Sequence, residues 1–358
     1  MIDMTPKKTK ENNENNNLLS PSRASNLEAE GAQRSEVEII EVWEDNFEEE
    51  MDKIQELLEK YNYVAMDTEF PGVYFQGDNV TGYSMIKTNV DQLKLIQVGI
   101  TLADENGVTP QPISTWQFNL RFDLKTDLYS ADSISMLKEA GIKFEELAEK
   151  GIDPLMFADR FLSSGLMLTE DIHWITFHGA FDFAYLMRVI SNTLLPNTLE
   201  KFKSAMKIYF PSVADIKVLM KEVHDLKSGA LSKLARDLDL KRIGTTHQAG
   251  SDAEITLRCF FKLKEEYFKN GISPKLLNKV FGLSNEYQST ATPTSNPPKP
   301  TPQDMQRMNM YPQYAAQPMG YYPYPGTDFQ QGFYYNQIEM PMMYSAMQTN
   351  DFSNTFKL

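Results

Sequence analysis

Residues 61–73 read Tyr61-Asn62-Tyr63-Val64-Ala65-Met66-Asp67-Thr68-Glu69-Phe70-Pro71-Gly72-Val73. The largely apolar residues before the first carboxylate predict a strand over Tyr63–Phe70. Asp67 and Glu69 are two residues apart, so both carboxylates point to the same face of that strand. Burying two like charges side by side is costly unless a cation pairs with them. Taken alone, this stretch fits two interpretations, a metal-binding pair or ordinary acids at a solvated strand end.

A further carboxylate follows in His178-Gly179-Ala180-Phe181-Asp182. The mostly apolar run Trp174–Phe177 predicts a buried strand that leads into a helix over Phe181–Ser191. Asp182 opens this helix, where a carboxylate is either a site residue or one that the helix dipole stabilises. His178 is either a core histidine or part of a site, and we favour a structural role.

The third segment is His247-Gln248-Ala249-Gly250-Ser251-Asp252, a loop followed by the last predicted helix. Ser251 and Glu254 have the spacing of a capping box, Asp252 falls in the first turn, and Asn270-Gly271 marks the end. A loop histidine beside a metal-bound carboxylate can take the proton of an attacking water, because its ordinary pKa is about 6.5. The alternative interpretation of His247 is a surface histidine.

The surrounding pattern predicts an α/β fold. An acidic helix is expected over Asn46–Lys60, among several others. Consecutive strands, followed by alternating helices and strands, indicate a mixed sheet covered on both faces by helices. The remaining predicted strands are Val37–Val42, Lys94–Leu102, Ser114–Leu120 and Pro211–Ala214.

Composition narrows the class of protein. The 358 residues are 41% hydrophobic, enough for one large domain or two small ones. Cys259 is the single cysteine, so no internal disulfide is possible, which fits the cytosol or the nucleus. No apolar run approaches the length of a membrane span, and the N-terminus lacks the apolar core of a signal peptide, so we expect no membrane.

The net charge of −14 is unusual for a protein that binds nucleic acid through phosphate contacts alone. If the substrate is nucleic acid, divalent cations should supply part of the neutralising charge. Local basic clusters could supply the rest, although solvated helix faces explain them equally well. These clusters are Lys201, Lys203 and Lys207, and Lys241 with Arg242.

Composition also divides the chain into three parts. Residues 1–36 are rich in Asn, Glu, Lys and Ser and predict a disordered N-terminal tail. Residues 37–287 carry all the patterned segments and predict a single domain. Residues 288–358 are dominated by Pro, Gln, Met and Tyr and predict a low-complexity, disordered C-terminal tail.

The three segments follow the order Asp-x-Glu, Asp, His-x4-Asp, which is the signature of the DEDD exonucleases with a histidine in the last motif. Together with residues 61–73, 114–119 and 242–244, they make the chain resemble the Caf/Pop-type mRNA deadenylases, catalytic subunits of the Ccr–Not complex. The resemblance spans roughly residues 37–287 and implies an RNase H-like α/β fold. The second motif departs from it, since a serine and a tyrosine are more usual there, and the segment between Val73 and Asn89 is shorter than expected.

The resemblance implies a poly(A)-specific 3′–5′ exoribonuclease that shortens mRNA poly(A) tails and releases 5′-AMP, in mRNA turnover and post-transcriptional repression. It implies two divalent ions, Mg²⁺ or Mn²⁺. Asp67 would bridge both ions, Glu69 and Asp252 would complete one, and Asp182 would hold the other, directly or through water. His247 would take the proton of the attacking water.

The same resemblance implies three partners: poly(A) RNA, the large scaffold subunit of the Ccr–Not complex and its leucine-rich-repeat deadenylase. The expected location is the cytoplasm, with the nucleus and cytoplasmic RNA granules as further candidates. Adenine preference could arise from stacking on Phe70 or Phe181, although a place in the core is the better interpretation of both rings.

Two rival functions are an inactive nuclease fold that links other subunits, and a DEDD exonuclease for DNA or structured RNA. The five intact site positions argue against an inactive fold, and the sequences of residues 70–73 and 114–118 argue against an exonuclease for DNA or structured RNA.

Overall fold

The computed structural model describes residues 38–76, 82–226 and 229–283. The two predicted tails and both ends of the predicted domain therefore lie outside the described residues. Among the described residues, no helix is both long and apolar enough to cross a bilayer.

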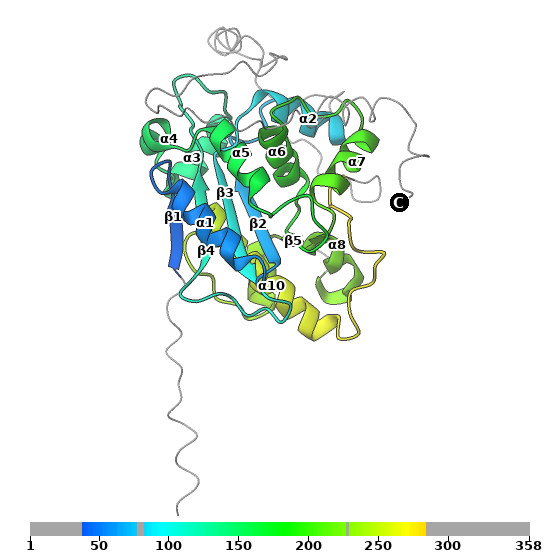
Figure 1. Cartoon of the computed structure of the whole chain (residues 1–358). Helices are drawn as coiled ribbons and strands as arrows, with labels where there is room; N and C mark the ends of the chain where they lie inside the picture. The colour runs from blue at the N-terminus through cyan, green and yellow to red at the C-terminus, as the bar shows by residue number, and fades with distance from the viewer. Residues whose placement is uncertain (1–37, 77–81, 227–228, 284–358) are drawn as a thin grey trace, which may run out of the picture. The chain divides into compact units, whose positions relative to one another are not determined.

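The described residues contain a six-stranded sheet with the order β1-β4-β3-β2-β5-β6 (Figure 1). The central strands β2, β3 and β4 are antiparallel, while β1 runs parallel to β4, and β5 runs parallel to both β2 and β6. The predicted mixed sheet is therefore confirmed. The strands are β1 (Glu38–Val42), β2 (Tyr63–Glu69), β3 (Gln97–Ala103), β4 (Ile113–Asn119), β5 (His173–Thr176) and β6 (Val213–Asp215).

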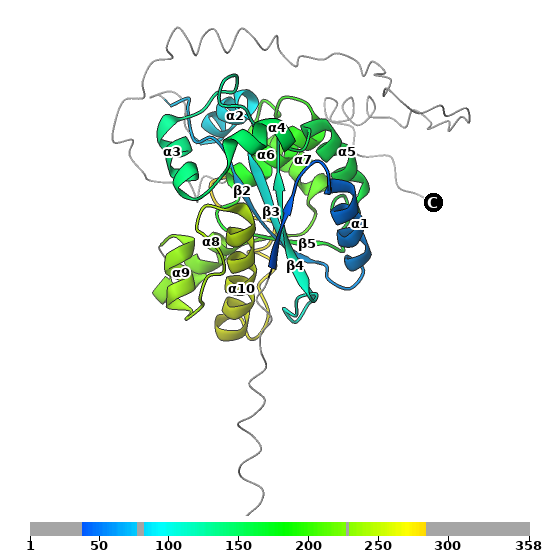
Figure 2. The ribbon, with the colours of Figure 1, turned by 90° about the vertical axis from the view of Figure 1, so that its left-hand side faces the viewer.

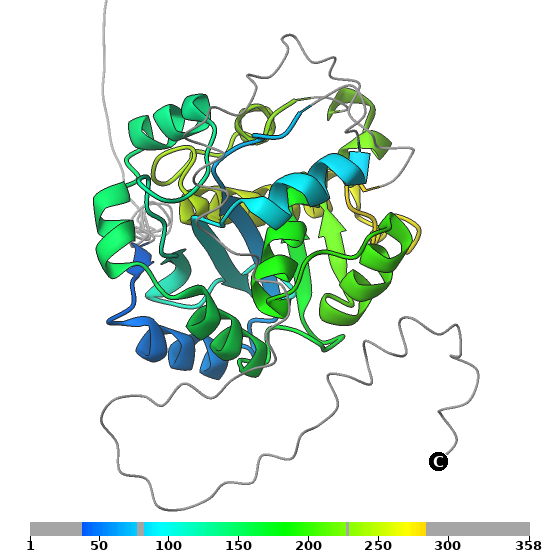
Figure 3. The same ribbon diagram turned by 90° about the horizontal axis from the view of Figure 1, so that it is seen from above.

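Helices cover both faces of the sheet, as predicted (Figures 2 and 3). One face packs on α10 (Ala249–Tyr267), together with α8 (Ile216–Leu219) and α9 (Leu231–Asp237). The opposite face packs on α1, α5, α6 and α7. The remaining helices have the bounds α1 (Phe47–Leu57), α2 (Gly82–Gln92), α3 (Ala131–Glu139), α4 (Phe144–Lys150), α5 (Pro154–Ser163), α6 (Ala180–Ser191) and α7 (Leu199–Tyr209), and two short 3₁₀ turns occupy Met220–Glu222 and His224–Leu226.

The residues of β2 show how the two faces differ. Val64 and Met66 belong to the large core under α1, α5 and α6, whereas Ala65 belongs to the core under α10. Because side chains alternate along a strand, Asp67 and Glu69 share the α10 face with Ala65. The apolar half of β2 thus anchors the strand in both cores, and its last residues carry the carboxylates to the start of α10.

The start of α10 differs from the prediction. The helix begins at Ala249, two residues before Ser251, and no side chain of its N-cap residue bonds to it. Ser251 and Glu254 do not form a capping box, because the Ser251 hydroxyl donates to Ile243 O and Glu254 pairs with Arg258. The helix also ends at Tyr267, three residues before the predicted stop.

Candidate active site

The carboxylate pair of β2 lies directly beside the first turn of α10. Asp67 is opposite Gly99 of β3, and Glu69 is opposite Gln97. A Cβ atom on Gly99 would lie 2.0 Å from the carbonyl oxygen of Ala249, so only glycine lets the helix approach the sheet here. Glu69 is buried and Asp67 is half-buried.

Asp182 is fixed to the residue between these two carboxylates. Strand β5 pairs only with residues 63–65 of β2, which leaves the backbone N–H of Thr68 without a strand partner on that side. Asp182, in the first turn of α6, fills this place: its Oδ1 accepts from Thr68 N at 3.0 Å and from the Thr68 hydroxyl. The predicted position of Asp182 at a helix start is confirmed, and its side chain is buried.

Asp252 lies in the first turn of α10, and two contacts set its orientation. Its Oδ2 accepts from the backbone N–H of His247 at 2.8 Å, and its Oδ1 forms an ion pair with Arg242 Nη1 at 2.8 Å. His247 has a φ of +63° and an exposed ring. Ligand atoms of Glu69, His247 and Asp252 all lie within 4.8 Å of one another.

The four carboxylates disturb one another electrostatically. Burial, and then Asp252, Asp182 and Glu69, raise the pKa of Asp67 well above its usual value, and Arg242 opposes the shift. Burial, followed by Asp252 and Asp182, likewise raises the pKa of Glu69. Burial raises the pKa of Asp182 to about 7, although its hydrogen bonds with Thr68 act in the other direction.

The cluster of four carboxylates requires compensating positive charge. Ionised carboxylates packed together in a buried place are stable only when positive charge or protons compensate them. Several carboxylate oxygens in one place are the ligands that Mg²⁺ and Mn²⁺ prefer. The donor set therefore fits the two divalent ions that the sequence led us to expect.

Two residues in and around this cluster were not recognised from the sequence. Arg242, interpreted as a phosphate contact or a solvated side chain, instead pairs with Asp252. Asp215 is completely buried at the end of β6, and it accepts backbone N–H groups from His178, Gly179, Lys217 and Phe281. An Asp where a strand meets a helix is a recognisable N-cap signal, but its contacts with distant residues are not readable from the sequence.

The remaining candidate residues from the sequence lie outside the carboxylate cluster. The ring of His178 is exposed and packs edge-on against Phe281 at 4.7 Å, so it is not a core histidine. Phe70 and Phe181 are half-buried and stack on each other at 5.1 Å, at the border of the large core. The lysines at 201, 203 and 207 are exposed on α7, as a solvated helix face would be.

The chain is similar to known ribonucleases over most of its described length. Residues 42–160 and 165–260 match the CAF1 family ribonuclease. The poly(A) ribonuclease pop2 of Schizosaccharomyces pombe is 44% identical over 253 residues, covering 69% of this chain and 75% of that protein. The probable CCR4-associated factor 1 homolog 10 of Arabidopsis thaliana is 42% identical over 275 residues, covering 74% and 99% of the two chains.

Solved structures give the same picture. S. pombe Pop2p in its Mg²⁺- and Mn²⁺-bound form aligns with a TM-score of 0.65 and 44% identity, covering 68% of this chain and 99% of that one. Yeast CAF1, co-crystallised with the NOT1 MIF4G domain, aligns with a TM-score of 0.62 and 32% identity, covering 69% and 97%. The mixed sheet flanked by helices is thus the RNase H-like fold of Pop2. The chain belongs to the CAF1 family of ribonucleases.

Proposed function

We propose that this protein is a poly(A)-specific 3′–5′ exoribonuclease that shortens mRNA poly(A) tails and releases 5′-AMP. The observation that carries the proposal is the convergence of four carboxylates, from three segments far apart in the chain, beside the loop histidine His247. The identity with a relative named poly(A) ribonuclease supports the choice of substrate.

Asp67, Glu69, Asp182 and Asp252 would hold the two divalent ions. Pop2p of S. pombe has been solved with Mg²⁺ and Mn²⁺ bound. When bound, such ions lower the pKa of a water molecule and stabilise negative charge on the leaving 3′ oxygen.

The protein side chains then have separate tasks. His247, which is exposed on the loop before α10, takes the proton of the attacking water at a ring nitrogen. Arg242 forms an ion pair with Oδ1 of Asp252 at 2.8 Å and so helps to fix the orientation of this carboxylate. Thr68 orients Asp182 through its N–H and its hydroxyl, so that the other carboxylate oxygen remains available.

The proposed setting is the Ccr–Not complex. Yeast CAF1 has been co-crystallised with the MIF4G domain of NOT1, which supports a large scaffold subunit as the partner of this chain. We extend the proposal to the leucine-rich-repeat deadenylase as a second partner, and to mRNA turnover and post-transcriptional repression in the cytoplasm, with the nucleus and RNA granules as further locations.

A substrate panel tests the proposal. A 5′-labelled RNA that ends in oligo(A), an RNA of mixed 3′ sequence and a single-stranded DNA are each incubated with Mg²⁺ or Mn²⁺. The expected result is shortening of the first RNA from its 3′ end, stalling where the adenosines stop, and no shortening by the Asp67→Ala variant. Equal shortening of both RNAs would contradict poly(A) specificity, and no shortening with either ion would favour a scaffold function.

A further inference from the structure

The first turn of α10 is capped by side chains from the sheet. Its N-cap residue, Gln248, makes no side-chain bond to a helix N–H. The backbone N–H of Gly250 instead donates to Gln117 Oε1 of β4 at 2.8 Å, and that of Ala249 donates to Gln97 Oε1 of β3 at 3.4 Å. Since the first N–H groups of any helix lack partners within the helix, the side-chain amides of Gln117 and Gln97 cap α10.

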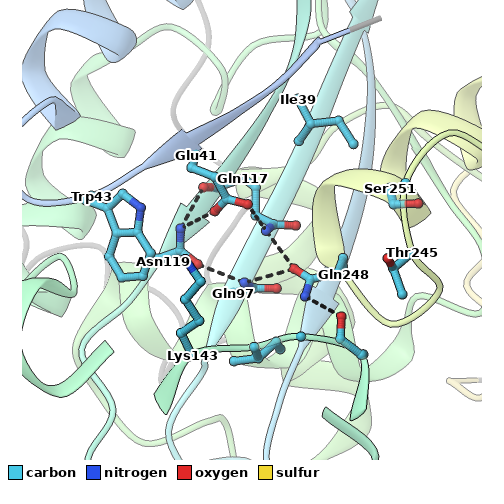
Figure 4. A pocket seen from close by; sticks show the side chains of 14 residues that line it. Ile39, Glu41, Trp43, Gln97, Gln117, Asn119, Lys143, Thr245, Gln248 and Ser251 are labelled. Carbon is cyan, nitrogen blue, oxygen red and sulfur yellow. Dashed lines mark hydrogen bonds between the residues drawn. The ribbon is translucent and has the colours of Figure 1, made fainter. Parts of the chain in front are cut away.

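The same two amides hold the side chain of Gln248 (Figure 4). Its Oε1 accepts from Gln117 Nε2 at 2.8 Å and from Gln97 Nε2 at 3.4 Å, and its Nε2 donates to the backbone oxygen of Ala140 at 2.9 Å. Both ends of Gln248 are therefore fixed, at the wall of a cavity of about 320 Å³.

The outer end of this network fixes which way each amide points. Glu41 accepts from Gln117 Nε2 at 2.9 Å and from Asn119 Nδ2 at 2.7 Å, and Asn119 Oδ1 accepts from Gln97 Nε2 at 2.8 Å. A carboxylate can only accept hydrogen bonds, so the side-chain amides of Gln117 and Asn119 must both point their nitrogen toward Glu41. The Oε1 atom of Gln117 then points the other way and can accept the N–H of Gly250 in α10. Gln97, Gln117 and Asn119 are at most 2% exposed, which strengthens every bond among them.

We propose that Gln117 and Gln97, acting through Gln248, are positioning residues for His247 and Asp252, an inference that rests on the proposed function. His247 directly precedes the clamped Gln248 and has a left-handed φ of +63°, so the loop is held in a conformation that a non-glycine residue rarely adopts. Asp252 belongs to the helical turn that the two amides cap. A shift of about 1 Å in such groups can cost about a hundredfold in rate.

The test uses Gln117→Met, which keeps the length of the side chain and removes its hydrogen bonds. The matched control is Thr115→Val on the same strand and face, which removes only the buried 3.0 Å hydrogen bond with Thr101. At saturating oligo(A) RNA and Mn²⁺, we expect Gln117→Met to lower the single-turnover rate by roughly tenfold to a hundredfold. The RNA concentration for half-maximal rate should not change, and the control should stay within about twofold of wild type.

A second background shows whether the effect passes through the histidine. In His247→Ala, the added Gln117→Met should lower the remaining rate by less than it does in wild type, because the part of the effect that passes through His247 is already lost and only the part that passes through Asp252 remains. A further drop as large as in wild type would overturn the inference, and so would a wild-type rate for Gln117→Met.

Hydrogen exchange gives a readout that does not need activity. Peptides spanning residues 244–256 should exchange faster in Gln117→Met than in Thr115→Val, since the Gly250 N–H at the start of α10 loses its acceptor and Gln248 loses one of its donors. Unchanged exchange would overturn the inference. A wild-type protein that leaves oligo(A) intact would contradict the proposed function instead, and the exchange comparison would still decide the role of the network.

Discussion

Replacing Asp215 by Asn tests how the fold holds the turn that leads to Asp182. The Asp215 carboxylate is completely buried and accepts four backbone N–H groups. Oδ1 accepts from His178 at 3.1 Å and Lys217 at 2.9 Å, and Oδ2 accepts from Gly179 at 3.1 Å and Phe281 at 2.9 Å. One side chain thus joins the turn before α6, the start of α8 and the last described loop.

The cost of the change follows from the number of acceptors. An asparagine side chain has one oxygen, so two of the four N–H groups face an NH₂ group and lose their partner. A buried N–H without a partner costs about 1–3 kcal/mol, so the two together should lower the free energy of unfolding by about 2–6 kcal/mol. Because His178 and Gly179 directly precede α6, the single-turnover rate should also fall.

Urea unfolding followed by circular dichroism measures the effect. Burial, opposed by the four hydrogen bonds, raises the pKa of Asp215 to about 6, so the comparison belongs at a pH well above this value, where the carboxylate is ionised. The control is Asp225→Asn, at an exposed residue whose side chain pairs with the neighbouring His224, where we expect a change within about 0.5 kcal/mol. Equal stability of Asp215→Asn and wild type would show that the four hydrogen bonds of Asp215 do not stabilise the fold.

Three further predictions concern the site itself. Burial raises the pKa of Asp182 from an ordinary 3.8 to about 7, so between these pH values the folded metal-free protein binds more protons than the unfolded chain. The thermal stability of the metal-free protein should therefore fall as the pH rises from 3.8 to about 7. Added Mg²⁺ should abolish this fall. His247→Ala should lower the single-turnover rate by about 10²- to 10⁴-fold, while Mn²⁺ affinity measured by calorimetry stays near that of wild type. Gly99→Ala places a methyl group 2.0 Å from the Ala249 carbonyl oxygen and should destabilise the fold by about 1–3 kcal/mol in urea unfolding.

The elements that local pattern controls were predicted well. The apolar residues of 63–66 and 174–177 each fill a core on one or both faces of the sheet, and both strands lie within a residue or two of their predicted bounds. Asp67 and Glu69 share a face because alternation along a strand is a local rule. The order of the motifs identified the family, and the comparisons confirmed it.

The features that were not predicted depend on contacts between distant segments of the chain. Ser251 was expected to cap α10, but amides from β3 and β4 take that task, and the helix starts two residues earlier. Arg242 had no readable partner in the sequence, because its pairing with Asp252 arises only when the loop folds back on the helix. Asp215 likewise binds N–H groups 36 and 66 residues away.

In the proposed mechanism, the carboxylate cluster holds two divalent ions that drive removal of nucleotides from a 3′ oligo(A) end. A Mn²⁺ titration by calorimetry, run in parallel with the shortening rate of 5′-labelled oligo(A) RNA, tests it most directly. This mechanism requires two ions bound per wild-type chain, a rate that depends on both of them, and loss of both binding and rate in Asp67→Ala. Full activity in Asp67→Ala, or shortening that persists after all divalent ions are removed, would contradict it.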